Sequence, residues 1–293
     1  MHIDARHINN NTLIEGDICI IGAGAAGISI ALELINTPYK VIVLEGGGFD
    51  YDQKVQELYK GSTSGQNFPH LTGSRLHYFG GTTGHWAGFC SPFDPIDFEQ
   101  RDWVPNSGWP LKREDLDPYY ERANKTIQLG PYNYDLEFWQ NKLPNMNPLP
   151  LNEKVIKTKM WQYNQARYKT LYKDAIINAK NIHLYTYANA VKIDTNDDAS
   201  HVNQVTVKNY SGKTHTVKAK HFIMACGAIQ NTRLLLASNS IAKAGLGNDN
   251  DLVGKNFMEH IEVAVADIHM LKPFNTDLYT FDYGVTKASG EFC

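Results

Sequence analysis

A glycine-rich run near the N-terminus constrains the fold more than any other feature. Residues 22–27 spell G-x-G-x-x-G. The apolar run before it, 18–21, is typical of a buried parallel strand, and residues 25–35 carry helix formers with one apolar face. A second apolar run, 41–44, ends at Glu45. Strand, helix and strand in this order predict a βαβ unit and hence an α/β fold.

The three glycines of this run have separate expected roles. Gly22 permits a tight turn, Gly24 lets a pyrophosphate approach the backbone, and Gly27 lets the helix pack on the strand. Ala25 and Ala26 open the helix, where free N–H groups and the positive end of the helix dipole favour phosphate. These five residues are candidate binding residues for a dinucleotide.

Glu45 completes the pattern, because it stands at the end of the second strand. A carboxylate at that place can accept hydrogen bonds from both hydroxyls of a ribose. The alternative is a glycine-rich turn that binds nothing, but the strand, the helix and the acid together favour a dinucleotide site. The pattern by itself does not distinguish NAD from FAD.

Composition argues against several other classes of protein. The chain has 293 residues, enough for about two domains, with 28 basic and 31 acidic residues and no basic patch, so no nucleic-acid partner is expected. No apolar stretch approaches ~18 residues, so no membrane span is expected. Residues 1–16 are polar and lack the apolar core of a secretion signal. The four cysteines form no C-x-x-C pair, which favours a reducing, cytoplasmic location and gives no metal site.

The middle of the chain has little regular periodicity. Residues 49–110 are rich in Gly, Ser, Thr, His and aromatic residues, which indicates a functional segment rather than a disordered one. A helix is expected over 112–129, with Asp115 as a candidate cap and Pro118 in its first turn. A second helix is expected over 168–179.

After this helix the periodicity becomes that of strands. Four alternating segments separated by turn residues predict an antiparallel meander: residues 183–187, 190–194, 202–208 and 214–219. A further apolar strand, 221–225, and a helix, 228–238, are expected to follow it.

Two distant motifs favour FAD over NAD. Residues 45–48, E-G-G-G, resemble the E-x-G-G that follows the second strand in two-dinucleotide-domain flavoproteins. Residues 222–228 resemble the late apolar strand of those proteins, which ends in A-T-G, lies beside the first strand and returns the chain to the cofactor. The resemblance implies that Ala225 and Gly227 contact FAD.

The stretch 79–88, F-G-G-T-T-G-H-W-A-G, is similar to the loop that glucose–methanol–choline (GMC) oxidoreductases hold against the flavin and its diphosphate. The similarity continues in four later segments, 107–111, 115–120, 225–235 and 253–260. It implies that the following loop residues contact the cofactor: Gly80, Gly81, Thr82, Thr83, His85 and Trp86.

Within that family, G-G-T-T-G-H-W most resembles the pyranose oxidase and sugar dehydrogenase branch. Some members of the branch carry a histidine bonded to the 8α carbon of the flavin, and His85 is the matching position. The alternative is a histidine that only packs or hydrogen-bonds near the ring. The resemblance also implies that Val191, on a meander strand, contacts adenine, although a plain core role is equally compatible.

The resemblance implies a base as well, a histidine near the C-terminus of the family's proteins. After His260 the only histidine is His269, which matches no catalytic motif, so no catalytic residue is assigned. Residues 261–271 alternate like the first strand of a substrate-domain sheet. Because the chain has about half the family's usual length, the simplest interpretation is a truncated or split form, unstable and weakly active alone.

The expected architecture is therefore an FAD/NAD(P)-binding Rossmann-like α/β domain with an inserted antiparallel meander, followed by the start of an α+β substrate-binding domain. The expected bounds are 15–60 with 183–258 for the FAD-binding domain, 61–182 for the flavin-contacting loop and helical insertion, and 259–293 for the truncated substrate-binding domain.

The expected function is oxidation of the CH–OH group of a sugar or other alcohol, with FAD as hydride acceptor. Two alternatives stay open: a non-catalytic flavin-binding subunit that needs a second chain to supply the missing half, and an NAD-linked dehydrogenase.

Overall fold

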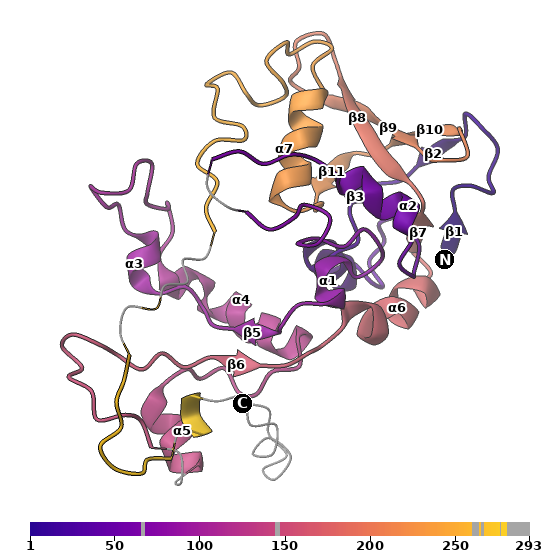
Figure 1. The fold of residues 1–293 in the computed structure, drawn as a ribbon. Helices are drawn as coiled ribbons and strands as arrows, with labels where there is room; N and C mark the ends of the chain where they lie inside the picture. The colour runs from indigo at the N-terminus through magenta and orange to yellow at the C-terminus, as the bar shows by residue number, and fades with distance from the viewer. Residues whose placement is uncertain (66–67, 144–146, 260–263, 265–266, 276, 280–293) are drawn as a thin grey trace. The chain divides into compact units, whose positions relative to one another are not determined.

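Figure 1 shows a computed structural model of the chain. The description covers residues 1–65, 68–143, 147–259, 264, 267–275 and 277–279. Two compact units are present: Met1–Trp86 with Arg167–Phe257, and Ala87–Ala166 with Met258–Cys293. The domain bounds expected from the sequence stay a prediction.

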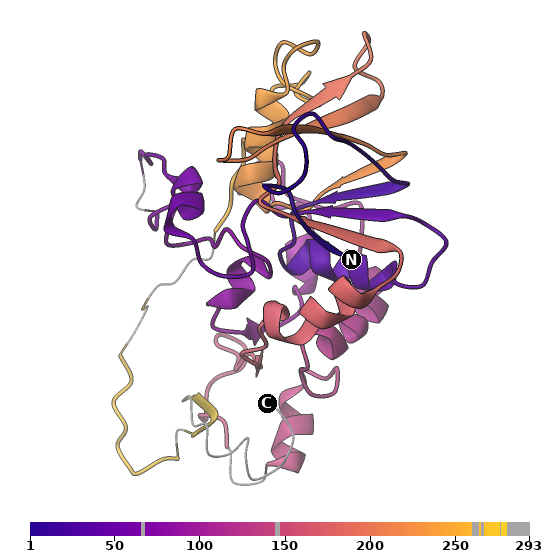
Figure 2. The same cartoon turned by 90° about the vertical axis from the view of Figure 1, so that its right-hand side faces the viewer.

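The first unit is built on a five-stranded sheet in which every pair of neighbours is parallel. Its order is β1 (His2–Asp4), β7 (Ile182–Thr186), β4 (Val41–Leu44), β3 (Ile18–Ile21) and β11 (His221–Met224). Helices α1 (Ala25–Glu33) and α6 (Tyr168–Asn178) lie side by side against this sheet (Figures 1 and 2). The predicted βαβ unit and the place of β11 beside β3 are confirmed.

One strand belongs to a different sheet from the one predicted. Residues 183–187 were expected to open the meander, but β7 pairs in parallel with β4, with Ile182 opposite Val41. Ile182 and Leu184 are fully buried, because a strand inside a parallel sheet is covered on both faces. Alternation along a short strand does not distinguish the two environments.

A second sheet has the order β2 (Leu13–Glu15), β10 (Thr214–Lys218), β9 (Val202–Lys208) and β8 (Asn189–Thr195). β8, β9 and β10 form the predicted antiparallel meander, and β2 joins β10 in parallel. Helix α7 (Ala228–Ala237) packs on β8. Val205, Val207, Val217 and Leu234 are buried together in the core of this unit.

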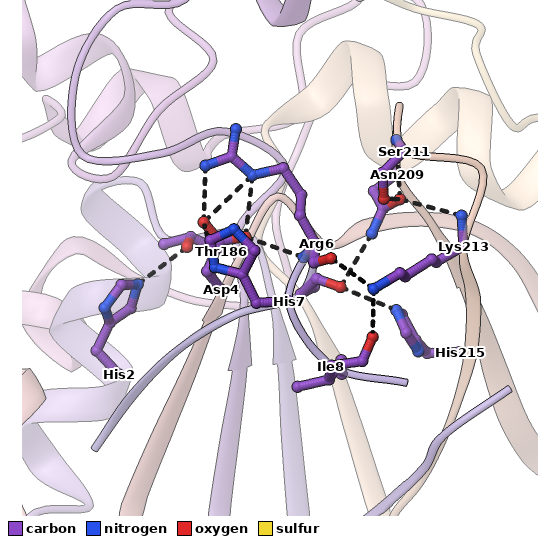
Figure 3. A network of polar contacts seen from close by, with 11 residues as sticks. His2, Asp4, Arg6, His7, Ile8, Thr186, Asn209, Ser211, Lys213 and His215 are labelled. Atoms are coloured by element: carbon purple, nitrogen blue, oxygen red, sulfur yellow. Dashed lines mark hydrogen bonds and ion pairs between the residues drawn. The ribbon is translucent and has the colours of Figure 1, made fainter. Parts of the chain in front are cut away.

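The N-terminal segment connects the two sheets, since β1 extends one sheet and β2 extends the other. Figure 3 shows the polar contacts that hold the stretch between these strands. Lys213 Nζ donates hydrogen bonds to the carbonyl oxygens of Arg6 and Ile8, each at 2.7 Å. Asn209 Nδ2 donates to the carbonyl oxygen of Ala5 at 3.1 Å. Neither N-terminal strand was predicted.

The second unit contains a two-stranded antiparallel sheet and short helices. Its described elements are β5 (Phe89–Cys90), β6 (Gln162–Tyr163), α3 (Pro95–Phe98), α4 (Arg113–Thr126), α5 (Leu136–Lys142) and η3 (Asp277–Tyr279). The predicted cap of α4 was wrong: the N-cap is Lys112, and the Asp115 carboxylate, three residues inside, accepts a hydrogen bond from the Lys112 N–H at 2.9 Å. Pro118 consequently lies beyond the first turn.

Two sequence predictions fall mostly outside the described residues. His260 is one of them, and the predicted strand over 261–271 is described only at residues 264 and 267–271, where no strand is present. Over the part of the chain that is described, no helix has the length and apolar character needed to cross a membrane. The same residues hold no group of three or more potential metal ligands.

Candidate cofactor site

Strands β3, β4 and β11 end at one edge of the parallel sheet, and the segments that leave them line a cavity of about 520 Å³. Most of the predicted binding residues line it: Gly22, Gly24, Ala25, Ala26, Glu45, Gly81, Thr82, Thr83, Trp86, Val191, Ala225 and Gly227. Gly27, Gly80 and His85 are not part of the lining. Ligands of open α/β sheets bind at this edge of the strands.

The glycine-rich turn is shaped by close backbone approaches. Gly22 has a φ of +104°, and a Cβ there would lie 2.6 Å from the carbonyl oxygen of Ala225 on the neighbouring strand. A Cβ on Gly27 would lie 1.9 Å from the Gly22 oxygen. By contrast, a Cβ on Gly24 would meet no atom within 4 Å. Gly22 and Gly27 are therefore required by packing, whereas Gly24 keeps the cavity wall open.

Helix α1 begins at the cavity without a side-chain cap. Its N-cap is Gly24, which has no side chain to accept from the first N–H groups, and Ala25 and Ala26 line the cavity. Uncapped N–H groups and the helix dipole together favour an anionic group at this end. This observation fits the diphosphate of a dinucleotide.

Glu45 is buried, with 5% of its surface exposed, and it holds two loops. Its Oε2 accepts a hydrogen bond from the Ala23 N–H at 3.0 Å, and its Oε1 accepts one from the Gly47 N–H at 2.9 Å. Burial raises the pKa of Glu45 to about 7, although these N–H groups oppose the shift. Each carboxylate oxygen keeps a second lone pair, so the residue can still accept from a ribose hydroxyl.

The loop that follows Phe79 lies directly against the glycine-rich turn. The Gly80 N–H donates to the carbonyl oxygen of Ala23 at 2.8 Å, and a Cβ on Gly81 would lie 3.0 Å from the Gly24 Cα. Thr83 Oγ1 donates to the Gly80 oxygen at 2.7 Å and keeps the loop in its turn conformation. The two motifs, distant in sequence, thus form one wall.

His85 has an exposed side chain, and its backbone N–H donates to the Thr82 oxygen at 3.1 Å. Because its ring does not line the cavity, a covalent bond from His85 to the flavin stays a prediction. Trp86, the next residue, lines the cavity, with its ring edge-on to Tyr168 at a centroid distance of 6.3 Å.

Several lining residues were not among the predicted site residues, and the polar or aromatic ones include Tyr59, Arg75, His77, Asn189 and Arg233. The His77 ring stacks on Tyr59, with 4.4 Å between centroids and an angle of 8°, and the Arg75 guanidinium lies 4.3 Å from the centre of the Tyr59 ring. Burial lowers the pKa of His77 to about 4, so its ring is neutral at pH 7. For Tyr59, Arg75 and His77 the sequence signal was the histidine and aromatic content of the irregular segment, and Arg233 lies in the similar segment 225–235.

Residues 17–242 match the DAO family model, described as FAD dependent oxidoreductase. The chain belongs to this family. FAD is the cofactor that the family uses, so the prediction of FAD rather than NAD is confirmed. The open wall at Gly24, the uncapped start of α1 and the carboxylate of Glu45 all fit that group.

Curated relatives of this FAD dependent oxidoreductase are similar at low identity. The 2-methyl-1,2-propanediol dehydrogenase of Mycolicibacterium austroafricanum is 25% identical over 95% of this chain and 60% of its own length. The fructose dehydrogenase large subunit of Gluconobacter japonicus is 23% identical over 88% of this chain and 60% of its own length. The chain therefore spans about three fifths of these relatives, which are enzymes of the GMC type, as the motifs predicted.

Among solved structures, a formate oxidase superimposes with a TM-score of 0.50 at 14% identity, covering 79% of this chain and 48% of the oxidase. At this identity the likeness concerns the fold alone. It supports the α/β architecture with a parallel sheet.

Proposed function

We propose that this chain binds FAD in the cavity at the ends of β3, β4 and β11. The observation that carries the proposal is that the glycine-rich turn, Glu45 and the loop around Gly81 meet at one cavity. The start of α1 takes the diphosphate, and Glu45 accepts from the ribose of the adenosine half. The cavity volume, about 520 Å³, lies within the usual range for cofactor sites.

We further propose that the bound flavin serves to oxidise the CH–OH group of an alcohol or sugar. FAD, when bound, supplies the hydride acceptor. The names of the relatives, a diol dehydrogenase and a fructose dehydrogenase, support this substrate class. The residues of this chain hold the cofactor and exclude water from one side of it, with Trp86 and Thr83 in the wall.

The base that removes the hydroxyl proton is not assigned to a residue of this chain. His77 lines the cavity but stacks on Tyr59 beside Glu45, at the end expected to hold adenosine. Because the relatives are longer, we propose that turnover needs further residues, on the same protein or on a second chain. The designation of one relative as a large subunit gives modest support to the second possibility.

A direct test is to titrate the purified chain with FAD and with NADH, the fluorescent reduced form of NAD, following the change in flavin or nicotinamide fluorescence. FAD is expected to bind with a Kd at or below about 1 μM and NAD at least about a hundredfold more weakly. Tight NAD binding without FAD binding would overturn the proposal in favour of an NAD-linked enzyme.

The catalytic part is tested separately. The FAD-loaded chain is mixed anaerobically with a 1,2-diol or fructose, without any other electron acceptor, and bleaching of the flavin is recorded. Reduction by either substrate supports an alcohol oxidoreductase. FAD binding without any reduction, alone or with the co-expressed remainder of a longer protein, would favour a non-catalytic flavin-binding subunit.

A further inference from the structure

The charges of the cavity wall are unevenly distributed. Arg75 and Arg233 are the only lysine or arginine residues among the lining residues that the structure describes. The glycine-rich turn itself contains no basic residue. The start of α1 contributes only about half a positive charge, whereas the diphosphate of FAD carries two negative charges.

Among the residues that the structure describes, the hydrogen-bond partners found for both guanidinium groups are uncharged. Arg75 donates from Nε to the Leu71 oxygen at 3.3 Å and from Nη2 to the Tyr59 oxygen at 3.4 Å, and both acceptors are backbone carbonyl groups. Arg233 makes one long contact, from Nη1 to the Leu58 oxygen at 3.5 Å. Within the described ranges, no carboxylate forms an ion pair with either one.

The two charges also lie close enough to act on each other. Burial lowers the pKa of Arg75, and the positive charge of Arg233 lowers it further. Both arginines add to the lowering of the His77 pKa that burial begins. Arg75 is half-buried and Arg233 is exposed. Two cations in one wall repel each other, and this repulsion is relieved when an anion enters.

The position of this pair relative to Glu45 indicates which part of the cofactor it meets. A Cβ on Gly46, next to Glu45, would lie 2.1 Å from His77 Nε2, and His77 stacks on Tyr59 beneath Arg75. The acid is expected to bind the ribose of the adenosine half. The arginines therefore flank the end of the cavity where that half and its phosphate lie.

We propose that Arg75 and Arg233 bind the phosphate charge of the AMP half of FAD and so make the cavity select nucleotides over riboflavin. This inference rests on the proposed FAD site. It assigns to two residues, one in an irregular loop and one on α7, a specificity that the glycine-rich motif does not supply. Methionine at either position keeps the length of the side chain and removes its charge.

The test compares Kd values of FAD, ADP, adenosine and riboflavin for the full chain and for Arg75→Met and Arg233→Met. Each variant is expected to weaken FAD and ADP about tenfold or more, which is the loss of one charge-assisted hydrogen bond, while riboflavin changes less than about twofold. Arg122→Met, on the exposed face of α4, is the matched control and should change none of them. Arg75→Lys and Arg233→Lys should restore part of the ADP affinity.

Each outcome decides between interpretations. Unchanged ADP and FAD affinity in both methionine variants would overturn the inference and leave the FAD site intact. An equal loss for adenosine and ADP would show that the arginines stack on the base rather than bind phosphate, and this also overturns it. A wild-type chain that binds neither FAD nor ADP would overturn the proposed function itself.

Discussion

The carboxylate of Glu45, at the end of β4, accepts a hydrogen bond from the backbone N–H of Ala23, in the turn that follows β3. The acid that was expected to bind a ribose therefore also fixes the turn that is expected to bind the diphosphate. We therefore expect binding of the ribose and binding of the diphosphate to be coupled through this side chain.

Replacement Glu45→Gln is expected to damage both functions. An amide can accept from only one of the two N–H groups of Ala23 and Gly47, and its NH₂ group faces the other donor. One buried N–H is then left without an acceptor, which lowers the free energy of unfolding by about 1–3 kcal/mol. Urea denaturation measures this, with Glu15→Gln, at an exposed position of β2, as the control. Equal stability of the two variants would contradict the structural role.

The pH dependence of stability gives a second measurement on Glu45. Because burial raises its folded-state pKa from 4.5 to about 7, the native protein keeps a proton that the unfolded chain has lost. The contribution of Glu45 to the free energy of unfolding therefore falls by about 3 kcal/mol as the pH rises from about 4.5 to about 7. Above pH 7 this contribution no longer changes.

His77 changes the free energy of unfolding in the opposite direction. Because its folded-state pKa is lowered to about 4, its contribution to the free energy of unfolding rises with pH up to about 6.5. The informative quantity is hence the difference in unfolding free energy between the wild type and Glu45→Gln at each pH. A difference that does not vary between pH 4.5 and 7 would show that the Glu45 pKa is ordinary.

Two glycine variants separate folding from cofactor binding. Gly27→Ala places a methyl group 1.9 Å from a backbone oxygen and is expected to cost about 3 kcal/mol of stability. In Gly24→Ala the new methyl group meets no protein atom within 4 Å, so the apo protein should melt at the wild-type temperature. Because that methyl group occupies space expected for the ligand, the Kd for FAD should rise roughly tenfold or more. Wild-type FAD affinity in Gly24→Ala would remove this glycine from the binding site.

The attachment of the flavin to His85 is decided by acid denaturation. Because the His85 ring is exposed and outside the cavity lining, we expect the yellow colour to separate from the precipitated polypeptide. Colour that stays with the polypeptide, and is lost in His85→Ala, would establish the covalent bond instead.

The N-terminal segment should loosen when Lys213 is replaced by methionine. The two hydrogen bonds to the Arg6 and Ile8 carbonyl groups are lost, which costs about 1–3 kcal/mol locally. Limited proteolysis should then cut residues 5–12 faster than in the wild type. Lys218→Met, at the exposed end of β10, the strand that begins directly after Lys213, serves as the control, and equal cleavage of both variants would refute the role of Lys213.

The sequence was sufficient for features that depend on local periodicity or on short motifs. The βαβ unit around Gly22 and Glu45 follows from one glycine run between two apolar strands. The strand β11 was predicted from its apolar run, but its place beside β3 was predicted only through the resemblance of residues 222–228 to flavoproteins. β1 and β2, by contrast, are three residues long, and strands so short have no measurable period.

The cationic pair could not be predicted for a different reason. Arg75 lies in an irregular loop and Arg233 on a helix, and no spacing rule connects positions so far apart in the chain. The same limit explains the wrong assignment of residues 183–187, because the partner of β7 is β4 rather than the strand that follows. Pairing between distant segments is set by the whole core, not by local sequence.

The place of β3 in the parallel sheet has a consequence for how the protein is made. Ile18 pairs on one side with Val41 and on the other with His221. During synthesis, β3 and its glycine-rich turn therefore leave the ribosome long before β11 exists, and closing so long a loop is entropically costly and slow. Until then an apolar edge of β3 is open to other chains. Co-translational aggregation, rather than loss of the finished fold, is thus the expected weak point of this protein, and added chaperone should raise its soluble yield.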